Sequence, residues 1–416
     1  MLISRTLRVT AATSMVAVPL LVSPLSVTPA WADDGQCTFP SKPYTGRPWA
    51  LQRVNLDELW AQSTGKGVKV AVIDTGVDVK NPQLKQAVDA SAGENLLPTK
   101  NAKGESIDRG NKQGTTDTVG HGTRVAGIIA ARPAKGTGFV GLAPDATIIP
   151  IKQNDAEGDG TAATLATAID DAVRKGAGVI NISQDTANAV APDDKLEAAV
   201  DRALERGVVV VASAGNDGLG GTVQITYPAS YKGVLAVAAS DRNNERASFS
   251  QSGEFVGVAA PGVDMISTVP GDGHCSDNGT SFSAPYVAGV AALLKAKYPK
   301  WSAQQIVAQI EQTAERSISG HDRLVGWGVV DPVKALTDVD PEHPVETPEP
   351  EGGVAKGEAP SVTPLHFGET ADERDLRLGT YVVVGGLVVV AGLGGTAVAV
   401  RDARRRRARV TGGTGS

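Results

Sequence analysis

The sequence is poor in several kinds of residue. Its 416 residues include only two cysteines, three methionines and five histidines, aromatic residues make up 4%, and the formal net charge is −6. This weak charge, with no basic excess in the body of the chain, argues against nucleic-acid binding. A hydrophobic fraction of 41% excludes a wholly disordered protein. The acidic spacing of a Ca²⁺ loop is missing as well, and we predict neither a metal nor a cofactor.

Long uncharged stretches are also scarce, and only two are long enough to cross a membrane, which excludes a polytopic membrane protein. The first lies in residues 1–32. Arg5 and Arg8 form a positive start, residues 9–28 are nearly all apolar or small, and Ala30-Trp31-Ala32 offers a small-x-small cleavage site. An uncleaved anchor is the alternative, but three prolines between residues 19 and 29 disfavour a long helix. We therefore predict a signal peptide and export.

The second uncharged stretch covers residues 380–400 and precedes a basic end of the chain. At 1.5 Å per residue, about 20 helical residues reach about 30 Å, the thickness of a bilayer core. Residues 401–416 contain six arginines, and an excess of Lys and Arg marks the cytoplasmic flank of a span. A buried core helix is the alternative, but it would not lie between an acidic segment and an arginine cluster. We predict a single-pass protein of the cell membrane with a cytoplasmic C-terminal tail.

Between these stretches lie an acidic segment and a large body. Residues 337–379 contain six prolines, eleven acidic and three basic residues, for a net charge of −8. Such a segment cannot bury enough apolar surface to fold, and we expect an extended, solvated linker. The body is then residues 49–336, preceded by a short arm over residues 33–48. With a signal peptide before it and an arginine tail after the span, the body is expected outside the cytoplasmic membrane.

The body alternates continuous apolar runs with amphipathic ones. Five runs rich in β-branched residues have the character of strands buried on both faces of a sheet. They cover residues 68–73, 147–151, 178–182, 208–212 and 234–238. Between them, residues 162–175 and 193–206 place apolar side chains at helical spacing. This alternation predicts an α/β fold with a mostly parallel sheet covered by helices on both faces. Active sites of such sheets lie beyond the carboxyl ends of the strands.

Asp74 occupies such a position, and two further polar residues open helices. Asp74 follows the first strand in VIDTGVD, His121 opens a helix in GHGTRVAG, and Ser281 begins a long apolar helix in GTSFSAPYVAG. Taken singly, each has a structural explanation: a turn aspartate, a histidine at a helix start and a serine N-cap. Together they match a nucleophilic triad, in which an imidazole accepts the proton of a serine hydroxyl. A carboxylate on the other ring nitrogen fixes the tautomer and stabilises the imidazolium.

The tetrahedral intermediate of such a reaction also needs hydrogen-bond donors for its oxyanion. Asn216 lies in SAGNDG, a glycine-flanked turn that follows a buried strand. An asparagine in such a turn ordinarily adopts the left-handed conformation. Here it is also placed to direct its amide at the reacting carbonyl, beside the backbone N–H of Ser281. We predict Asn216 as the oxyanion donor.

These four motifs resemble the signature set of the subtilisin-like serine proteases, over nearly the whole body from Trp49 to Leu336. With the signal peptide, the acidic linker, one span and a basic tail, the chain is most similar to the mycosins, the subtilases of type VII secretion systems. The resemblance implies a three-layer sandwich around a mostly parallel sheet of about seven strands. It also implies endopeptidase activity on exported proteins and association with a type VII secretion membrane complex.

The resemblance further implies substrate-binding residues after two strands, namely Ser183, Gln184, Ser213, Ala214 and Gly215. At the first of these places the sequence reads Ile-Ser-Gln-Asp where subtilisins have Ser-Leu-Gly, so the specificity pocket cannot be copied from a relative. The sixteen residues of the arm are too few for the folded inhibitory pro-domain of secreted subtilisins. The 46 residues between Asp74 and His121 are polar and are expected to form a long loop near the cleft.

Cys37 and Cys275 are the only cysteines in the sequence. Two free thiols would be expected in a reducing cytosol, but export places them in an oxidising compartment, where an even count fits a single pair. A Cys37–Cys275 disulfide would fasten the arm to the body near the rim of the active site. Mycosins have an arm that wraps the catalytic domain, but usually more cysteines, so their connectivity is not transferred.

Two other functions are compatible with parts of this pattern. One is a structural component that stabilises a secretion complex, with proteolysis secondary; a pure scaffold, however, has no physical reason to keep all four site residues. The other is an esterase or transacylase with the same triad, but such enzymes generally show a G-x-S-x-G elbow, which is missing around Ser281. A membrane-anchored serine endopeptidase is the leading hypothesis.

Overall fold

The computed structural model describes residues 37–100, 104–106, 108–155, 160–183, 192–219, 225–350 and 369–411, the last range with side chains up to Arg406. The predicted signal peptide, Gln184 and residues 351–368 of the predicted linker lie outside these ranges. The chain divides into two compact units, one on each side of the bond between Gly352 and Gly353.

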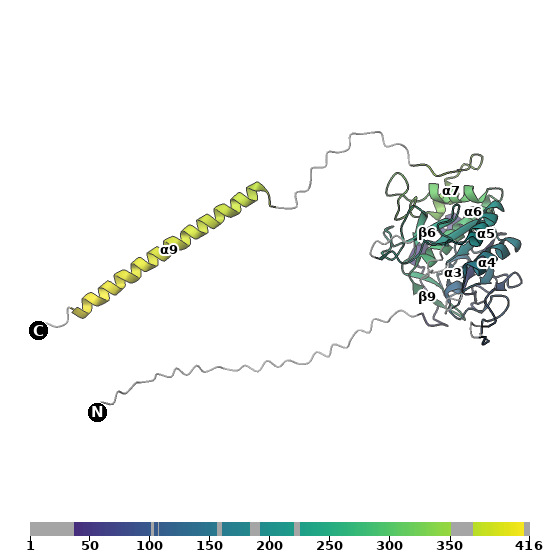
Figure 1. The fold of residues 1–416 in the computed structure, drawn as a ribbon, viewed down its shortest axis with the longest axis horizontal. Coiled ribbons are helices and arrows are strands. Elements are labelled where there is room, and N and C mark those ends of the chain that lie inside the picture. The colour runs from purple at the N-terminus through teal and green to yellow at the C-terminus, as the bar shows by residue number, and fades with distance from the viewer. Residues whose placement is uncertain are drawn as a thin grey trace, which may run out of the picture. The chain divides into compact units, whose positions relative to one another are not determined.

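A sheet of seven parallel strands forms the centre of the first unit (Figure 1). In order across the sheet, the strands are β2 (Glu94–Asn95), β3 (Thr147–Lys152), β1 (Lys69–Asp74), β4 (Val179–Ile182), β5 (Val209–Ser213), β6 (Leu235–Ser240) and β7 (Val256–Pro261). Every neighbouring pair is parallel. The predicted α/β fold with a parallel sheet of about seven strands is confirmed.

Alternate residues of the strands face two different layers of helices. In β1, Val70 and Val72 pack with α3 (His121–Ala130) and α6 (Thr280–Lys297), whereas Ala71 and Ile73 pack with α4 (Ala162–Arg174) and α5 (Asp194–Glu205). These four strand residues are fully buried. Because both faces are covered, both sets of side chains must be apolar, which is why the strands appear in the sequence as continuous apolar runs. Full burial of a valine or isoleucine side chain contributes about 1.5–3 kcal/mol.

Four shorter helices complete the layer of α3 and α6. They are α1 (Trp49–Gln52), α2 (Leu56–Gln62), α7 (Ala303–Gln312) and α8 (Pro332–Thr337). Each contributes buried residues to the same hydrophobic cluster, among them Leu51, Leu59, Ile306 and Leu336. This layer surrounds α6, which is buried over most of its length and carries Ser281 near its start.

The five strands and two helices expected from the sequence are present, with ends that differ by at most two residues. The sequence did not predict β2, β7 or the antiparallel pair β8 (Met265–Thr268) and β9 (His274–Asp277). The expectation of a loop between Asp74 and His121 was wrong in part, because this segment contains β2, which pairs with β3 and extends the sheet. A polar strand of two residues leaves no apolar run to detect.

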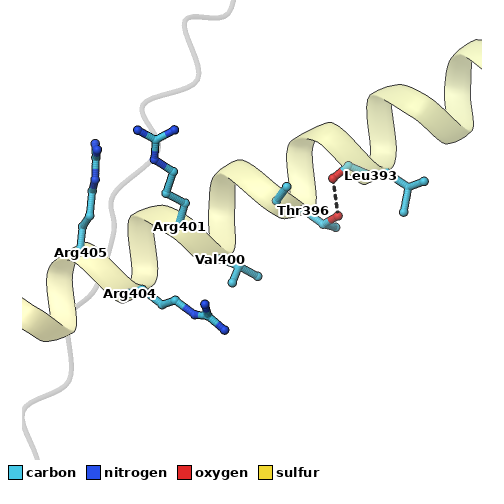
Figure 2. Close-up of a pocket in the computed structure, with 7 residues that line it drawn as sticks. Leu393, Thr396, Val400, Arg401, Arg404 and Arg405 are labelled. Carbon is cyan, nitrogen blue, oxygen red and sulfur yellow. Dashed lines mark hydrogen bonds between the residues drawn. The ribbon is translucent and has the colours of Figure 1, made fainter.

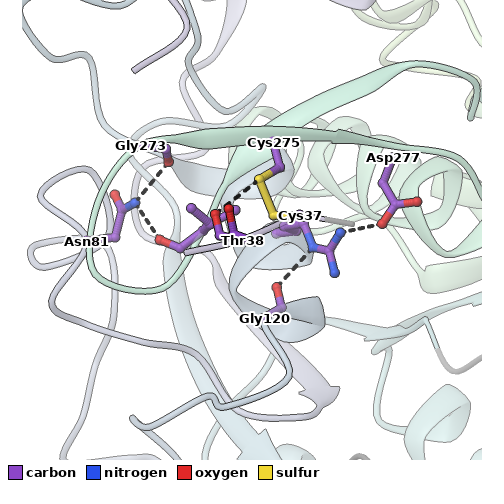
Figure 3. Close-up of a disulfide and its surroundings, with 9 residues drawn as sticks. Cys37, Thr38, Asn81, Gly120, Gly273, Cys275 and Asp277 are labelled. Atoms are coloured by element: carbon purple, nitrogen blue, oxygen red, sulfur yellow. Dashed lines mark hydrogen bonds and ion pairs between the residues drawn. A yellow bond between two sulfur atoms is a disulfide. The ribbon is translucent and has the colours of Figure 1, made fainter. Parts of the chain in front are cut away.

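The N-terminal arm is fastened to the body beside β9 (Figure 3). Cys37 and Cys275 form a disulfide, with 5.7 Å between their Cα atoms. The main-chain N–H of Ser41 donates to a carbonyl group of the 270–273 turn (2.9 Å). The main-chain N–H of His274 donates to a carbonyl group of the arm (3.2 Å). The buried His274 ring also takes part: Nδ1 accepts from Tyr44 N–H (3.0 Å) and Nε2 donates to Gln83 Oε1 (2.7 Å). The arm therefore reaches the segment that leads into Ser281.

The acidic segment differs from the expected solvated linker in its first part. The side chains of α7 and of the turn after it hold residues 338–350. Gln305 Nε2 donates to Glu346 Oε1 (2.7 Å), and Arg316 Nη1 donates to Glu349 O (2.6 Å). A segment that is too polar to form a core is thus still bound to the surface through hydrogen bonds, which the composition alone does not predict.

The second unit contains a single described helix, α9 (Ala371–Thr411), which is long and apolar enough to cross a membrane. Residues 371–379, expected to be extended, are helical. A capping box starts the helix, because Thr370 Oγ1 accepts from Glu373 N–H (3.2 Å) and Glu373 Oε2 accepts from Thr370 N–H (3.0 Å). The helix continues beyond the apolar stretch, and Figure 2 shows Arg401, Arg404 and Arg405 on the turns after Val400.

Candidate active site

The end of β1 and the start of α3 bring Asp74 and His121 together. The Nδ1 atom of His121 lies 2.8 Å from Oδ1 of Asp74. His121 is the first residue of α3 and follows Gly120, whose φ of 84° favours glycine. The next residue, Gly122, permits the close approach of helix and strand, because a Cβ there would lie 2.1 Å from Gly76 O.

The surroundings of His121 act on its pKa in opposite directions. Burial lowers the pKa, but the negative charge of Asp74 and the hydrogen bond to it raise it by more, so that the pKa of His121 lies above its usual value. The carboxylate, which is itself buried, accepts a hydrogen bond from Nδ1–H and leaves Nε2 as the basic nitrogen. An imidazole in this tautomer can accept a proton at Nε2.

A second buried carboxylate, Asp117, organises the start of α3 and was not predicted from the sequence. It accepts hydrogen bonds from Thr75 Oγ1 (2.9 Å), Gly120 N (2.7 Å) and both N (2.9 Å) and Oγ1 (2.6 Å) of Thr123. Burial raises the pKa of Asp117, although the bonds from Thr123 and Gly120 oppose the rise. Its position four residues before His121 was the available signal, because a carboxylate just ahead of a helix stabilises the N-terminal end.

Asn216 and Ser281 meet at the N-terminal end of α6. Asn216 Oδ1 accepts from Thr280 N–H (2.9 Å) and Thr280 Oγ1 (3.1 Å), which directs the amide nitrogen away from Thr280. A Cβ on Gly279 would lie 2.9 Å from Ser281 Oγ and 3.7 Å from Asn216 Nδ2. The hydroxyl and the amide nitrogen therefore border the same small space.

The structure also decides between the alternative explanations for these two residues. The N-cap of α6 is Gly279 and has no side-chain cap, so Ser281 is the second residue of the helix and not a serine N-cap. Among the described residues other than glycine, positive φ angles occur at Asn244 and Asp264, and in the turn after β5 Gly215 has the positive φ (110°) in place of Asn216. The local structural roles thus do not account for Ser281 and Asn216.

One aromatic contact joins the two halves of the site. Phe282, the residue after Ser281, packs its ring against the His121 imidazole with 5.4 Å between the ring centroids. Asp74 and His121 are in this way placed beside the start of α6, where Ser281 and Asn216 meet. As expected for a parallel sheet, Asp74 at the end of β1 and Asn216 after β5 lie at the same edge.

Comparison with known proteins gives the same assignment. Residues 65–328 match the subtilase family. The chain belongs to this family. M-protease of Shouchella clausii (strain KSM-K16) is 40% identical over 284 residues, which are 68% of this chain and 68% of that protein. Subtilisin Savinase of Lederbergia lenta is 40% identical over 284 residues, 68% of this chain and 96% of that protein. The protein is a subtilisin-like serine endopeptidase.

Solved structures resemble this subtilase over most of its length. MycP1 with the N-terminal propeptide removed is 35% identical, with a TM-score of 0.62, and the match covers 72% of this chain and 99% of that one. MycP3 from the type VII (ESX-3) secretion system is 35% identical, with a TM-score of 0.61 and coverage of 72% and 90%. MycP1 from Mycobacterium smegmatis is 32% identical, with a TM-score of 0.61 and coverage of 76% and 91%. The resemblance of this subtilase to the mycosins is confirmed.

Several of the residues predicted to bind substrate are buried or already hydrogen-bonded inside the protein. Ser183, after β4, is fully buried, and its Oγ accepts from Asn181 Nδ2 (2.7 Å). Gln184 lies outside the described residues. The hydroxyl of Ser183 therefore faces the protein interior, and a contact with substrate at this position would have to use the main chain.

The second predicted substrate segment follows β5, which ends at the buried Ser213. Ala214 N–H donates to Val237 O (2.9 Å), and Gly215 N–H donates to Thr280 Oγ1 (3.2 Å). Because both N–H groups are used inside the subtilase, Ala214 and Gly215 can form the wall of a pocket but cannot donate these bonds to a peptide. Among the described residues, no group of three or more His, Cys, Asp or Glu side chains could hold a metal ion.

Proposed function

We propose that this subtilase hydrolyses peptide bonds with a triad of Asp74, His121 and Ser281 and with Asn216 as a donor to the oxyanion. The observation that carries the proposal is the 2.8 Å contact between His121 Nδ1 and Asp74 Oδ1 beside the start of α6. The buried carboxylate has a reason to be there in a peptidase, because it raises the basicity of the imidazole that takes the serine proton.

In this mechanism, Ser281 Oγ attacks the scissile carbonyl carbon while His121 Nε2 accepts the hydroxyl proton. Asp74 holds the resulting imidazolium through Nδ1. The oxyanion accepts hydrogen bonds from Asn216 Nδ2 and from the main-chain N–H of Ser281 at the helix N-terminus. His121 then donates its proton to the leaving amine, which breaks the peptide C–N bond and leaves an acyl group on Ser281. Water attacks the ester with His121 again as the base, which releases the acid and restores the hydroxyl.

We further propose that α9 spans the cell membrane, with the arginine tail in the cytoplasm and the peptidase outside. Arg401, Arg404, Arg405 and Arg406 follow the apolar part of α9, whereas Asp372 and Glu373 lie in its first turn. The excess of arginine at one end supports this orientation. The substrates would then be exported proteins, and the likeness to MycP3 from a type VII secretion system supports an association with such a membrane complex.

Labelling of the full-length protein with a fluorophosphonate tests the triad. The matched control is Ser283→Ala, because Ser283 is a buried serine of the same helix whose Oγ has no hydrogen-bond partner among the described residues. We expect the wild-type protein and the Ser283→Ala variant to be labelled, and the Ser281→Ala variant to be unlabelled although folded. Label on Ser281→Ala, or none on folded wild-type protein, would contradict the proposal.

A structural role in a secretion complex is the second candidate. A related MycP1 that is 32% identical to this chain is described as an essential component of the type VII (ESX-1) secretion system. Complementation of a deletion strain separates the two roles. If the Ser281→Ala protein restores secretion as well as the wild-type protein does, contact and not proteolysis supports secretion. If only wild-type protein restores it, proteolysis is required.

A further inference from the structure

Arg124 is a nearly buried arginine on the same helix as His121, and the mechanism above does not use it. Its side chain is 11% exposed. Its Nε donates to Gly120 O (3.2 Å), its Nη1 forms an ion pair with Asp277 Oδ2, and its guanidinium carbon lies 5.5 Å from the centroid of the Phe282 ring. One side chain thus makes three different kinds of contact with three separate segments.

Two of the three partners adjoin site residues, and the third lies near the disulfide. Gly120 precedes His121, Phe282 follows Ser281, and Asp277 is the last residue of β9, two positions after the disulfide-bonded Cys275. Figure 3 shows Gly120 and Asp277 close to the disulfide, with dashed lines from both to one guanidinium group. The guanidinium therefore lies where the starts of α3 and α6 and the end of β9 meet.

We propose that Arg124 is a positioning residue for the peptidase reaction, which holds the His121 end of α3 against the Ser281 end of α6 and joins both to β9. The inference rests on the proposed triad. An arginine suits this place, because its planar fork can bond a carbonyl and a carboxylate at the same time while its face covers an aromatic ring. A lysine would keep the charge but could not reproduce all three contacts.

The charge of Arg124 also acts on His121. Among the described residues, three charged side chains have the main electrostatic effects on the pKa of His121: Asp74 from β1, Arg124 from α3 itself, and Asp117 from the loop before α3. From α6 the neighbour is the uncharged Phe282, and Asp277 of β9 pairs with Arg124. The two carboxylates raise the pKa of His121 and Arg124 lowers it. The contacts of Arg124 and its charge can therefore be tested separately, with variants that keep or remove the positive charge.

Four variants of the full-length protein, Arg124→Gln, Arg124→Lys, Asp277→Asn and Arg202→Gln, separate the two effects. The last is the matched control: Arg202 also pairs with an aspartate, Asp170, but lies on α5 in the other helix layer. For each folded variant, kcat and KM are measured from pH 5 to 9 with a quenched fluorescent peptide that the wild-type protein cleaves. The rate of fluorophosphonate labelling gives a second readout of Ser281.

We expect Arg124→Gln to lower kcat about 10-fold with little change in KM, and to move the acid limb of the pH profile to higher pH. Arg124→Lys should lower kcat without moving the limb, because the charge remains. Asp277→Asn should move the limb to lower pH, because the charge of Arg124 is no longer balanced. Arg202→Gln should change neither.

Unchanged kcat in both Arg124 variants would overturn the proposal, and so would a lower kcat with an unmoved acid limb in Arg124→Gln, which is the result of a merely structural role. If Arg124→Gln fails to fold, the kcat of Arg124→Lys and the acid limb of Asp277→Asn still test the proposal. Failure of the triad itself gives a different result, because the wild-type protein would then resist labelling by the fluorophosphonate. Normal wild-type labelling with unaffected variants refutes the role of Arg124 alone.

Discussion

Thr280 offers the sharpest test of how the oxyanion donor is oriented. The substitution Thr280→Val keeps the size and β-branching of this fully buried residue and removes the hydroxyl. In the structure the hydroxyl donates to Asn216 Oδ1 (3.1 Å) and accepts from Gly215 N–H (3.2 Å). The main-chain N–H of Thr280 still donates to Asn216 Oδ1 at 2.9 Å after the change, so that one of two orienting bonds is lost.

The expected decrease in kcat follows from the loss of one of these two hydrogen bonds. Removal of a side-chain oxyanion donor lowers kcat about 10²–10³-fold, or about 2.7–4 kcal/mol, a value established in subtilisin, a relative of this chain. If half of that free energy depends on the hydroxyl, Thr280→Val lowers kcat roughly 10- to 30-fold. The N–H of Gly215 also loses its buried partner, which costs about 1–3 kcal/mol of stability.

A double-mutant cycle measures the coupling between Thr280 and Asn216. Turnover is compared for wild type, Thr280→Val, Asn216→Ala and the double variant, with Thr280→Ser as the control that keeps the hydroxyl. We expect Thr280→Val to slow the wild-type enzyme but to have no further effect once Asn216 is alanine, because Thr280 acts through that amide. An equal loss in both backgrounds would refute this reasoning, and so would a Thr280→Ser enzyme as slow as Thr280→Val.

Three further predictions concern stability and topology. Replacement of both Cys37 and Cys275 by serine removes a cross-link between residues 238 positions apart. The chain-entropy model predicts a decrease of up to about 5 kcal/mol in the free energy of unfolding. Urea titrations that coincide for the wild-type protein and the variant would show that the disulfide does not stabilise the fold. Burial lowers the pKa of His274 from 6.5 to about 4, so the unfolded chain binds the proton first. Stability should therefore fall as the pH drops from 6.5 to about 4, and His274→Gln should weaken this dependence; an unchanged dependence would assign it to other groups. Protease added to intact cells should cut between residues 337 and 379 and release the peptidase while the arginine tail stays protected, whereas loss of the tail in sealed cells would indicate the opposite orientation.

Much of the fold was predictable from the sequence because its signals are local. Residues 70–73 of β1 and 209–212 of β5 are apolar without interruption, and such strands are stable when both faces are covered, as in a parallel sheet between helix layers. All strands of that sheet end at the same edge, so Asp74 at the end of β1 and Asn216 after β5 were expected near each other. The pairing of Cys37 with Cys275 followed from export and an even count. The polar strand β2, the bound part of the acidic segment and the capped start of α9 were missed, because none of them has an apolar period.

How the site residues are held was decided by the tertiary structure alone. Thr280 orients Asn216 across 64 positions of the sequence, and Arg124 reaches Asp277 across 153. Which polar side chains meet at such distances depends on the packing of α3 against α6 and on the path of β9. Hydrophobic periodicity determines which face of a helix is buried, but it carries no information on the rotation or shift of one helix against its neighbour. The sequence therefore determines which residues can do the chemistry. The packing of the helices determines the hydrogen bonds and ion pairs that orient these side chains.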